Sequence, residues 1–347
     1  MAWLGTHSRF FAFALIGVIA FSAAADESDP ETQTVTFLFE NDLFGDTDQQ
    51  YTNGLRLSWL SPDLAKLSEL DRIPEWAVST VERLPMFGYA RHSDRQFNVG
   101  MALGQLIFTP DDTSTRALVT DDRPYAGWLF GSLSFISKNA AIADTLEIQL
   151  GMIGPASLAE EAQKLVHDIR DLPEPRGWDN QLDNEPGLLL FYERKWRRTY
   201  RFDNSRFGVD VFPQGGVALG NVMTFINVGA EVRAGFNLPS DFGTTLIRPG
   251  GDANAPLTTG APHQGVGIYA FTGMSGKLSI RDIFLDGNTF GSSHDVKKKY
   301  VVGDWIIGAS LVWKQAKLSY AKVFRTREFD GQNSRHSFGS ITFSFSF

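Results

Sequence analysis

The chain has 347 residues, of which 43% are hydrophobic and 21% charged, and this composition is too apolar for a disordered or fibrous protein. The absence of cysteine excludes disulfides, thiolate metal sites and a cysteine nucleophile. The formal net charge of -8 argues against a protein that tracks nucleic-acid phosphates, for which a basic surface is expected. The length is compatible with one or two domains.

The N-terminus has the organisation of a secretory signal peptide. A short segment with one arginine, 1–9, precedes an apolar run over 10–21 and the small residues Ala23 to Ala25. We therefore expect cleavage after Ala25 and a single exported domain over 26–347. The rest of the chain contains no apolar run of the roughly eighteen residues that a transmembrane helix needs. Strands that alternate apolar and polar residues would escape that criterion.

Most of the remaining chain does alternate apolar residues with small or polar ones. Between 341 and 347 every second residue is Ile or Phe, and the residues between them are Ser or Thr. The segment 54–59 repeats the pattern, and a period of two predicts strands with one apolar face. We predict about twelve strands, over 32–43, 51–61, 96–108, 126–138, 143–153, 186–198, 207–220, 222–236, 266–282, 299–313, 315–327 and 337–347.

An even number of strands of about ten residues each is typical of an all-β transmembrane antiparallel β-barrel. Gly220-Asn221 and Trp313-Lys314 are short links that resemble periplasmic turns, and we expect them to alternate with long links on the other side. The long links cover 62–95, 109–125, 154–185, 237–265 and 283–298. The competing fold is a soluble periplasmic β-sandwich, in which the final strand would usually end in a polar tail rather than in Phe347.

One stretch has a helical period instead. From Pro155 to Arg170, apolar residues recur at three- and four-residue spacing, which predicts a short helix in an extracellular loop. Ser157 is expected to cap its first turn. The helix carries His167 near its C-terminal end and runs into an irregular acidic and aromatic loop over 171–180. A helix with a histidine on the rim of a barrel is unusual for a passive pore.

The first two predicted strands bring possible metal ligands together. The first ends with Glu40 and Asp42, and the second begins near Thr52, so their pairing would place Asp42 near Thr52 at one end of the barrel. If Phe39 faces lipid, strand alternation turns all three of these side chains inward. Carboxylate, amide and hydroxyl oxygens are the ligands that Ca²⁺ prefers. An Asn-Asp pair before a turn more often serves the turn itself, and both interpretations stay open.

His167 is a candidate general base, because imidazole titrates closest to neutral pH. A histidine on a helix more often has a structural role, and that alternative also stays open. A serine hydrolase would place a nucleophile beside its base, and the chain contains no Gly-x-Ser-x-Gly sequence.

Several separated blocks agree, in order, with one known family. As a set they are specific, and through them the chain resembles the LpxR-type lipid A deacylases, a family of outer-membrane barrels. The blocks are F-E-N-D-L-F-G-D-T-D-Q-Q-Y-T-N-G-L-R-L-S-W (39–59), D-D-R-P-Y-A-G-W (121–128), G-M-I-G-P (151–155), Q-K-L-V-H (163–167) and G-W-D-N-Q-L (177–182).

The resemblance implies a barrel that uses Ca²⁺ to hydrolyse the 3′-acyloxyacyl ester of lipid A. The site is then expected between the barrel wall and the outer leaflet of the bacterial outer membrane. Lipid A or lipopolysaccharide is the expected partner, nucleic acid is not expected, and we expect a monomer.

The resemblance also implies roles for single residues. Asn41 and Asp42 match the family's Asn-Asp pair at the end of the first strand, Thr52 matches its Tyr-Thr-x-Gly threonine, and His167 matches its catalytic histidine. Asp42 is thus expected to bind Ca²⁺, and Asn41 and Thr52 to position metal, water or oxyanion. His167 is expected to activate the attacking water, with Ca²⁺ stabilising the oxyanion.

Two positions depart from the family. Thr115 stands where the family has a lysine, which leaves Arg116 to hold a lipid A phosphate. Pro173 stands where the family has an acid, and Glu174 follows one residue later, so Glu174 or a neighbour is expected to orient the imidazole. These departures leave room for a different lipid substrate.

Two other functions compete with this one. The nearer is a phospholipase-like acyl hydrolase of the same membrane. The other is a non-enzymatic porin or structural barrel, in which the helix over 155–170 and its loop merely plug the lumen.

Overall fold

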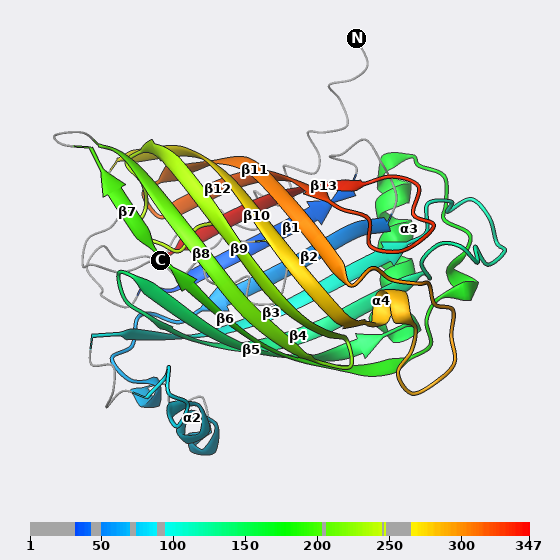
Figure 1. Ribbon diagram of the computed structural model, residues 1–347, viewed down its shortest axis with the longest axis horizontal. Helices are drawn as coiled ribbons and strands as arrows, with labels where there is room; N and C mark the ends of the chain where they lie inside the picture. The colour runs from blue at the N-terminus through cyan, green and yellow to red at the C-terminus, as the bar shows by residue number, and fades with distance from the viewer. Residues whose placement is uncertain are drawn as a thin grey trace, which may run out of the picture.

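The computed structural model of the protein describes residues 32–42, 50–69, 74–88, 94–202, 206–244, 246–247 and 265–347. These residues form one closed antiparallel barrel (Figure 1). The expected signal peptide, 1–25, lies outside the described residues.

The barrel wall is built from strands whose limits agree with the predicted ones to within two residues. Consecutive strands pair with each other except β6 and β7, and the pairings of β1 with β13 and of β6 with β8 close the barrel. β7 continues β6 beyond Arg197, and both pair with β8, so the wall has the twelve strands predicted. The strands are β1 (Thr34–Asn41), β2 (Gln50–Leu60), β3 (Gln96–Thr109), β4 (Ala126–Lys138), β5 (Ile142–Ile153), β6 (Glu185–Trp196), β7 (Arg198–Arg201), β8 (Phe207–Gly220), β9 (Met223–Phe236), β10 (Val266–Asp282), β11 (Val301–Trp313), β12 (Ala316–Arg325) and β13 (His336–Ser346).

Strand alternation gives the wall an apolar outer face. On β3, Met101 and Leu103 are exposed on the outside, whereas Leu106 and Phe108 are buried in the interior. The other strands expose further large apolar side chains in the same way, which is the surface that a barrel needs against lipid. They include Leu55, Leu57, Leu150, Leu188, Leu190, Leu219, Ile226, Val228, Ile268, Ile307 and Leu311.

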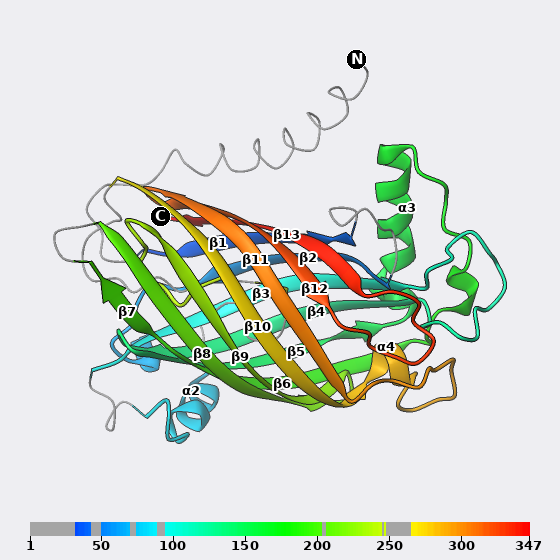
Figure 2. The same cartoon turned by 45° about the horizontal axis from the view of Figure 1, so that its top comes forward.

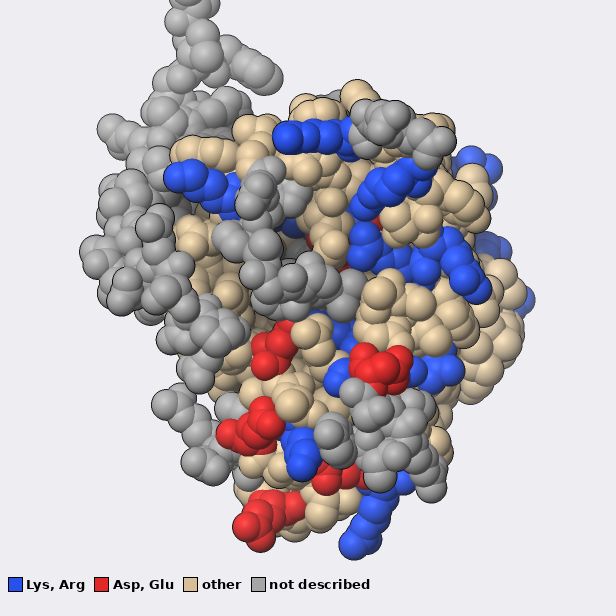
Figure 3. Space-filling view, turned by 90° about the vertical axis from the view of Figure 1, so that its left-hand side faces the viewer, with Lys and Arg blue, Asp and Glu red and all other residues tan. Residues whose placement is uncertain are grey.

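The two ends of the barrel differ in what covers them. The helices α3 (Ala159–Arg170) and α4 (Ile283–Asp286) lie at one end, which we call the α3 end, and β13 finishes at the opposite end (Figures 1 and 2). Figure 3 views the opposite end, where Lys and Arg side chains lie over both the upper and the lower part and Asp and Glu side chains lie mostly over the lower part.

The predicted separation of short and long links was wrong. Asn221 donates to the Glu185 carboxylate, which places the short link 220–221 at the α3 end, beside the long links 110–125 and 154–184. The other short link, at 314–315, lies at the opposite end together with the long links that follow β2 and β9. Both of those long links fold back onto the barrel, one outside and one inside.

The link after β2 packs against the outside of the wall. Val78 and Val81 of α2 (Glu75–Glu82) cluster with Phe97 of β3 and Phe135 of β4. The remaining short helices are η3 (Leu67–Glu69), η5 (Pro155–Ser157) and η6 (Trp178–Asn180). In the described part of the chain, no helix combines the length and the apolarity needed to cross a membrane.

The link after β9 enters the lumen, and we call its described residues 238–244 and 246–247 the luminal segment. Asp241 is buried and pairs with Arg233 of β9 and with Lys317 of β12, the latter at 2.8 Å. Phe242 packs against inward-facing side chains of β5 and β8. Because Arg233 and Lys317 hold the pKa of Asp241 below its ordinary value despite burial, the carboxylate stays charged and ties the segment in place.

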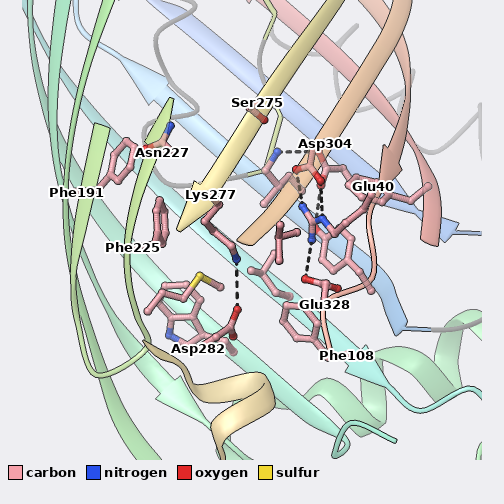
Figure 4. A pocket seen from close by; sticks show the side chains of 18 of the residues that line it. Glu40, Phe108, Phe191, Phe225, Asn227, Ser275, Lys277, Asp282, Asp304 and Glu328 are labelled. Carbon is pink, nitrogen blue, oxygen red and sulfur yellow. Dashed lines mark hydrogen bonds and ion pairs between the residues drawn. The ribbon is translucent and has the colours of Figure 1, made fainter. Parts of the chain in front are cut away.

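The far part of the luminal segment, at Ile247, reaches β1 near its C-terminal end. The Ile247 amide donates to Glu40 of β1 at 2.8 Å, so Glu40 faces inward as predicted. A cavity of about 130 Å³ remains beside Ile247, lined by charged pairs such as Lys277–Asp282 at 3.4 Å (Figure 4). The luminal segment, rather than the helix over 155–170, is therefore what occupies the lumen.

Candidate active site

The helix α3 is seated on the outside of the barrel wall by two glycines. Gly154 has φ +85° and turns the chain out of β5, and Gly127 of β4 lies directly beneath η5 and α3. A Cβ added at Gly127 would stand 2.1 Å from the Ser157 hydroxyl and 2.2 Å from the Ala159 Cβ. Glycine is therefore required there for the helix to contact the wall.

The helical stretch begins differently from the prediction. Leu158 has φ +57° and divides it into η5 and α3. The Ser157 hydroxyl donates to the Gly154 carbonyl at 2.6 Å, and α3 has no side-chain cap. The predicted capping role of Ser157 was wrong, because the left-handed residue after it turns the serine away from the first turn of α3.

An aromatic pair holds α3 from the side. The Trp178 indole of η6 donates to Gln163 of α3 at 2.8 Å, and its ring lies 4.9 Å from the Tyr125 ring. These side chains cluster with Ala159 and with Ile107 of β3. The helix is thus locked against the outer face of β3 and β4.

His167 lies on the face of α3 that is turned toward the protein, and only 3% of its surface is exposed. Its Nδ1 is 2.6 Å from the Pro173 carbonyl oxygen. Asp171, with φ +54°, reverses the chain after α3 and brings Pro173 back to the ring. Since a carbonyl only accepts hydrogen bonds, Nδ1 carries the hydrogen, and the neutral ring has its lone pair on Nε2. This is the tautomer that a general base at Nε2 needs.

The Glu174 carboxylate points elsewhere. It lies 3.2 Å from the Lys164 ammonium, its side chain is 64% exposed, and Lys164 also pairs with Glu160 at 2.8 Å. The sequence offered Glu174 or a neighbour as the partner of the imidazole, and in the structure the group in contact with Nδ1 is the backbone carbonyl of Pro173.

Asn41 and Thr52 join three strands at the α3 end. The Asn41 amide donates to the Thr52 carbonyl at 2.9 Å, and the Thr52 hydroxyl lies 2.7 Å from the hydroxyl of Thr109 on β3. All three residues are buried. The network links the ends of β1, β2 and β3 through polar groups.

The inward direction predicted for Thr52 was wrong. The β2–β3 register shifts between Tyr51 and Asn53, so Thr52 is an extra residue in a β-bulge. As a result Tyr51 turns inward and donates to Glu40 at 2.9 Å, while Thr52 turns outward to Thr109. A strand pattern that counts alternate residues fails at such a bulge.

The bulge places Thr52 on the same side of the wall as α3. Thr109 and Ile107 are two residues apart on β3 and therefore share a face, about 7 Å apart. Ile107 packs against α3, and Thr109 bonds Thr52. The helix that bears His167 and the polar network of Asn41 and Thr52 thus lie on the outer face of the wall at the same end of the barrel.

Asp42 follows the last residue of β1 and is fully buried, with 0% of its surface exposed. Its carboxylate and the amide, hydroxyl and carbonyl oxygens of Asn41 and Thr52 are of the type that Ca²⁺ binds. Within the ranges that the structure describes, no three His, Asp or Glu side chains converge on a metal position. In kind, the carboxylate of Asp42 and the neutral oxygens of Asn41 and Thr52 are compatible with Ca²⁺.

Arg116 lies in the link between β3 and β4, at the α3 end. The residue is exposed. Its backbone carbonyl accepts a hydrogen bond of 2.9 Å from the side chain of Asn180, the last residue of η6. That bond ties the backbone of Arg116 to the loop that braces α3. The structure therefore fixes the backbone of Arg116 beside η6, and its role toward a substrate stays a prediction.

A buried ion pair holds neighbouring loops together at this end. Arg123 pairs with Glu328 at 2.7 Å, and both are buried. Burial by itself raises the pKa of Glu328, but Arg123 and Arg325 outweigh it and hold the pKa at about 2. The pair joins the β3–β4 link to the β12–β13 link.

The sequence did not single out several residues that build the site, namely Gly127, Gln163, Trp178, Thr109 and the carbonyl of Pro173. The first three lie within the blocks that carry the family resemblance, and that signal could have found them. Thr109 and the Pro173 carbonyl leave no comparable mark, because one is a strand residue among many and the other is a backbone group.

The comparisons with known proteins identify the family and the fold. The family described as Outer membrane protein LpxR matches residues 10–347. The fold is similar to that of LpxR from Salmonella typhimurium, with a TM-score of 0.72 at 17% sequence identity, over 90% of this chain and 100% of that chain.

Other barrels are less similar. The β domain of the Bordetella autotransporter BrkA has a TM-score of 0.43 at 8% identity, over 92% of this chain and 100% of that chain. An outer membrane channel from Pseudomonas putida F1 has a TM-score of 0.41 at 9% identity, over 94% of this chain and 98% of that chain. Among curated proteins, none matches the chain significantly.

Proposed function

Because the chain belongs to the LpxR family of outer-membrane proteins, we propose that it is a Ca²⁺-dependent deacylase that hydrolyses the 3′-acyloxyacyl ester of lipid A. The outer-membrane location predicted from the sequence is confirmed by this family and by the barrel fold. The observation that carries the proposal is the position of His167. It is buried against the outer wall, with Nδ1 held by the Pro173 carbonyl, at the end of the barrel where Asn41 and Thr52 meet.

In the proposed reaction His167 Nε2 removes a proton from a water that attacks the ester carbonyl. The Pro173 carbonyl accepts the Nδ1 hydrogen bond, and this bond strengthens as the ring becomes positively charged. The proton then passes from Nε2 to the departing alkoxide, which leaves as the sugar hydroxyl. When bound, Ca²⁺ supplies a positive charge for the oxyanion that forms at the carbonyl.

The polar network would hold the remaining groups. Asp42 supplies the charged Ca²⁺ ligand, and Asn41 and Thr52 position the metal, the water or the oxyanion. Thr52 is itself fixed by Thr109, so its hydroxyl is preorganised at the wall. Arg116 is exposed at the rim and binds a phosphate of lipid A in this proposal.

A site on the outside of the wall suits a lipid substrate, because a lipid reaches it from the membrane without entering the barrel. The lumen is occupied by the luminal segment, whose Asp241 and Phe242 are buried among inward-facing side chains. This arrangement speaks against the porin alternative. The phospholipase-like alternative shares the same site and differs only in which lipid is bound.

Mass spectrometry of the lipids tests the proposal. Protein purified in detergent is incubated with lipid A in Ca²⁺ or in EDTA, and parallel samples contain phospholipid instead. The proposal predicts loss of the 3′-linked acyloxyacyl mass from lipid A in Ca²⁺ alone. Fatty acid released only from phospholipid would favour the phospholipase, and no release from either lipid by folded protein would contradict the enzymatic assignment.

A further inference from the structure

The surface of α3 divides into three sectors. Successive residues on a helix are about 100° apart, and on this wheel Ala159, Gln163 and His167 form the sector that is buried against the protein. A polar sector follows, with Glu160, Lys164 and Asp168. The third sector contains Leu165 and Ile169, which are 60% and 53% exposed, and Leu158, the 54% exposed residue directly before the helix, adds a further apolar side chain.

The apolar sector is contiguous and borders the wall. Leu165 and Ile169 lie about 40° apart on the wheel, and Ala162 and Val166, both half-buried, continue the sector toward the buried face. A helix in water that already has one buried face would carry polar residues on the rest of its surface. Three neighbouring large apolar side chains therefore indicate a second apolar environment.

The direction of α3 fits a membrane surface. In both Figures 1 and 2 the helix runs nearly at right angles to the long axis of the barrel, and a helix perpendicular to the barrel axis lies in the plane of the bilayer. A helix with one apolar and one charged face in that plane is typical of the interface between acyl chains and headgroups.

The apolar sector also continues the lipid-facing wall. Gln105 of β3 donates to the Ser157 carbonyl, directly before the start of α3, at 2.7 Å. The next outward residue on that strand is Leu103, which is 61% exposed, and Leu150 of β5 is 60% exposed. The helix thus begins where the apolar wall ends.

We propose that the apolar sector of α3 inserts among the acyl chains of the membrane leaflet at the α3 end, which is the outer leaflet in the expected orientation. The polar sector then faces the headgroups. The insertion places the buried sector, with His167, at the depth where the ester bonds of a lipid lie. This last consequence rests on the proposed function, whereas the insertion itself does not.

Single cysteine variants with a nitroxide spin label test the insertion, since the chain has no cysteine of its own. Leu165→Cys and Ile169→Cys probe the apolar sector, and Asp168→Cys, adjacent in sequence and exposed, probes the polar sector. Leu103→Cys on the wall serves as the lipid-exposed reference. In proteoliposomes of outer-membrane lipids, the accessibility of each label to oxygen and to a water-soluble nickel complex is measured, and folding is checked by the heat-dependent shift in gel mobility.

The insertion predicts that labels at 165 and 169 resemble the label at 103, with high oxygen and low nickel accessibility, and that the label at 168 shows the reverse. High nickel accessibility at 165 and 169 in folded protein would overturn the proposal. This result does not depend on enzymatic activity.

A second variant connects the insertion to the site. Leu165→Asn combined with Ile169→Asn is expected to lose deacylation in bilayers and to keep it in detergent, where lipid A reaches the site without the leaflet. Equal activity in both settings would contradict the role of the apolar sector in placing His167. If the unaltered protein were inactive in both, the proposed function would fail while the label measurement still decided the insertion.

Discussion

Replacing Gly127 by alanine should displace α3 and its histidine without breaking the barrel. The added Cβ would lie 2.2 Å from the Ala159 Cβ and 2.1 Å from the Ser157 hydroxyl. Ordinary contact begins at 3.4 Å, so the helix must move outward by roughly 1 Å, the size of misplacement that costs about 100-fold in rate. That factor corresponds to about 2.7 kcal/mol of transition-state stabilisation.

The assay is release of fatty acid from lipid A in detergent with Ca²⁺, measured for Gly127→Ala and for Gly131→Ala. Gly131 lies on the same strand and the same face as Gly127, but the nearest atom to its added Cβ is the Ala102 carbonyl oxygen at 3.9 Å. We expect Gly131→Ala to keep its activity and Gly127→Ala to lose about two orders of magnitude in kcat, with both proteins folded. Full activity of Gly127→Ala would refute the idea that contact between α3 and the wall positions the base.

Three further predictions concern charged groups. Glu174→Gln should keep nearly full deacylase activity, because the Glu174 carboxylate pairs with Lys164 at the surface and such pairs contribute about 0–1 kcal/mol to stability. A loss of activity comparable to that of His167→Ala would show that Glu174 acts on the imidazole. The pKa of Glu328 is lowered from 4.5 to about 2, so its charged form adds about 3 kcal/mol of stability above pH 4.5. That contribution is lost as the pH falls toward 2. Thermal unfolding, monitored by gel mobility, should therefore show that acidification lowers the stability of the unaltered protein more steeply than that of Glu328→Gln. Asp241→Ala removes the carboxylate shared by Arg233 and Lys317 and should raise ion conductance in planar bilayers; unchanged conductance relative to the unaltered protein would show that other contacts retain the luminal segment.

The strands could be predicted closely because lipid on one side and a polar lumen on the other impose a strict two-residue period. β4, β8 and β10 end where the pattern does. The same reasoning failed at Thr52, because a bulge adds one residue and turns its side chain to the other face. Thr52, whose side-chain direction the alternating pattern predicted wrongly, is also a residue of the candidate site.

The links were harder to predict, since their sequences have no period to indicate a partner. In sequence the residues 238–244 and 246–247 resemble an ordinary loop, and it is the structure that shows their entry into the lumen, through the burial of Asp241 between Arg233 and Lys317 and through further contacts. For the same reason, the prediction that the short links all lie at one end of the barrel was wrong. Link length carries no information about whether a segment folds back onto the barrel.

The residues of the candidate site remain a prediction from the sequence, and their contacts could not be predicted from it. His167, Asn41 and Thr52 were chosen by residue type and resemblance, and the structure adds which atoms hold them. The hydrogen bond from His167 to the Pro173 carbonyl depends on a left-handed Asp171, a conformation that a single sequence does not reveal. Backbone groups that orient a catalytic side chain leave no residue-type signal.

The most direct test of the central claim compares His167→Ala with His294→Ala. His294 also contacts a backbone carbonyl at the α3 end, that of Asp122 at 2.7 Å, so the two variants remove the same imidazole from different places. Lipid A incubated with each folded variant in Ca²⁺ is examined by mass spectrometry. The account predicts that the 3′-linked acyloxyacyl group is lost with His294→Ala and retained with His167→Ala, and deacylation by His167→Ala at the unaltered rate would contradict it.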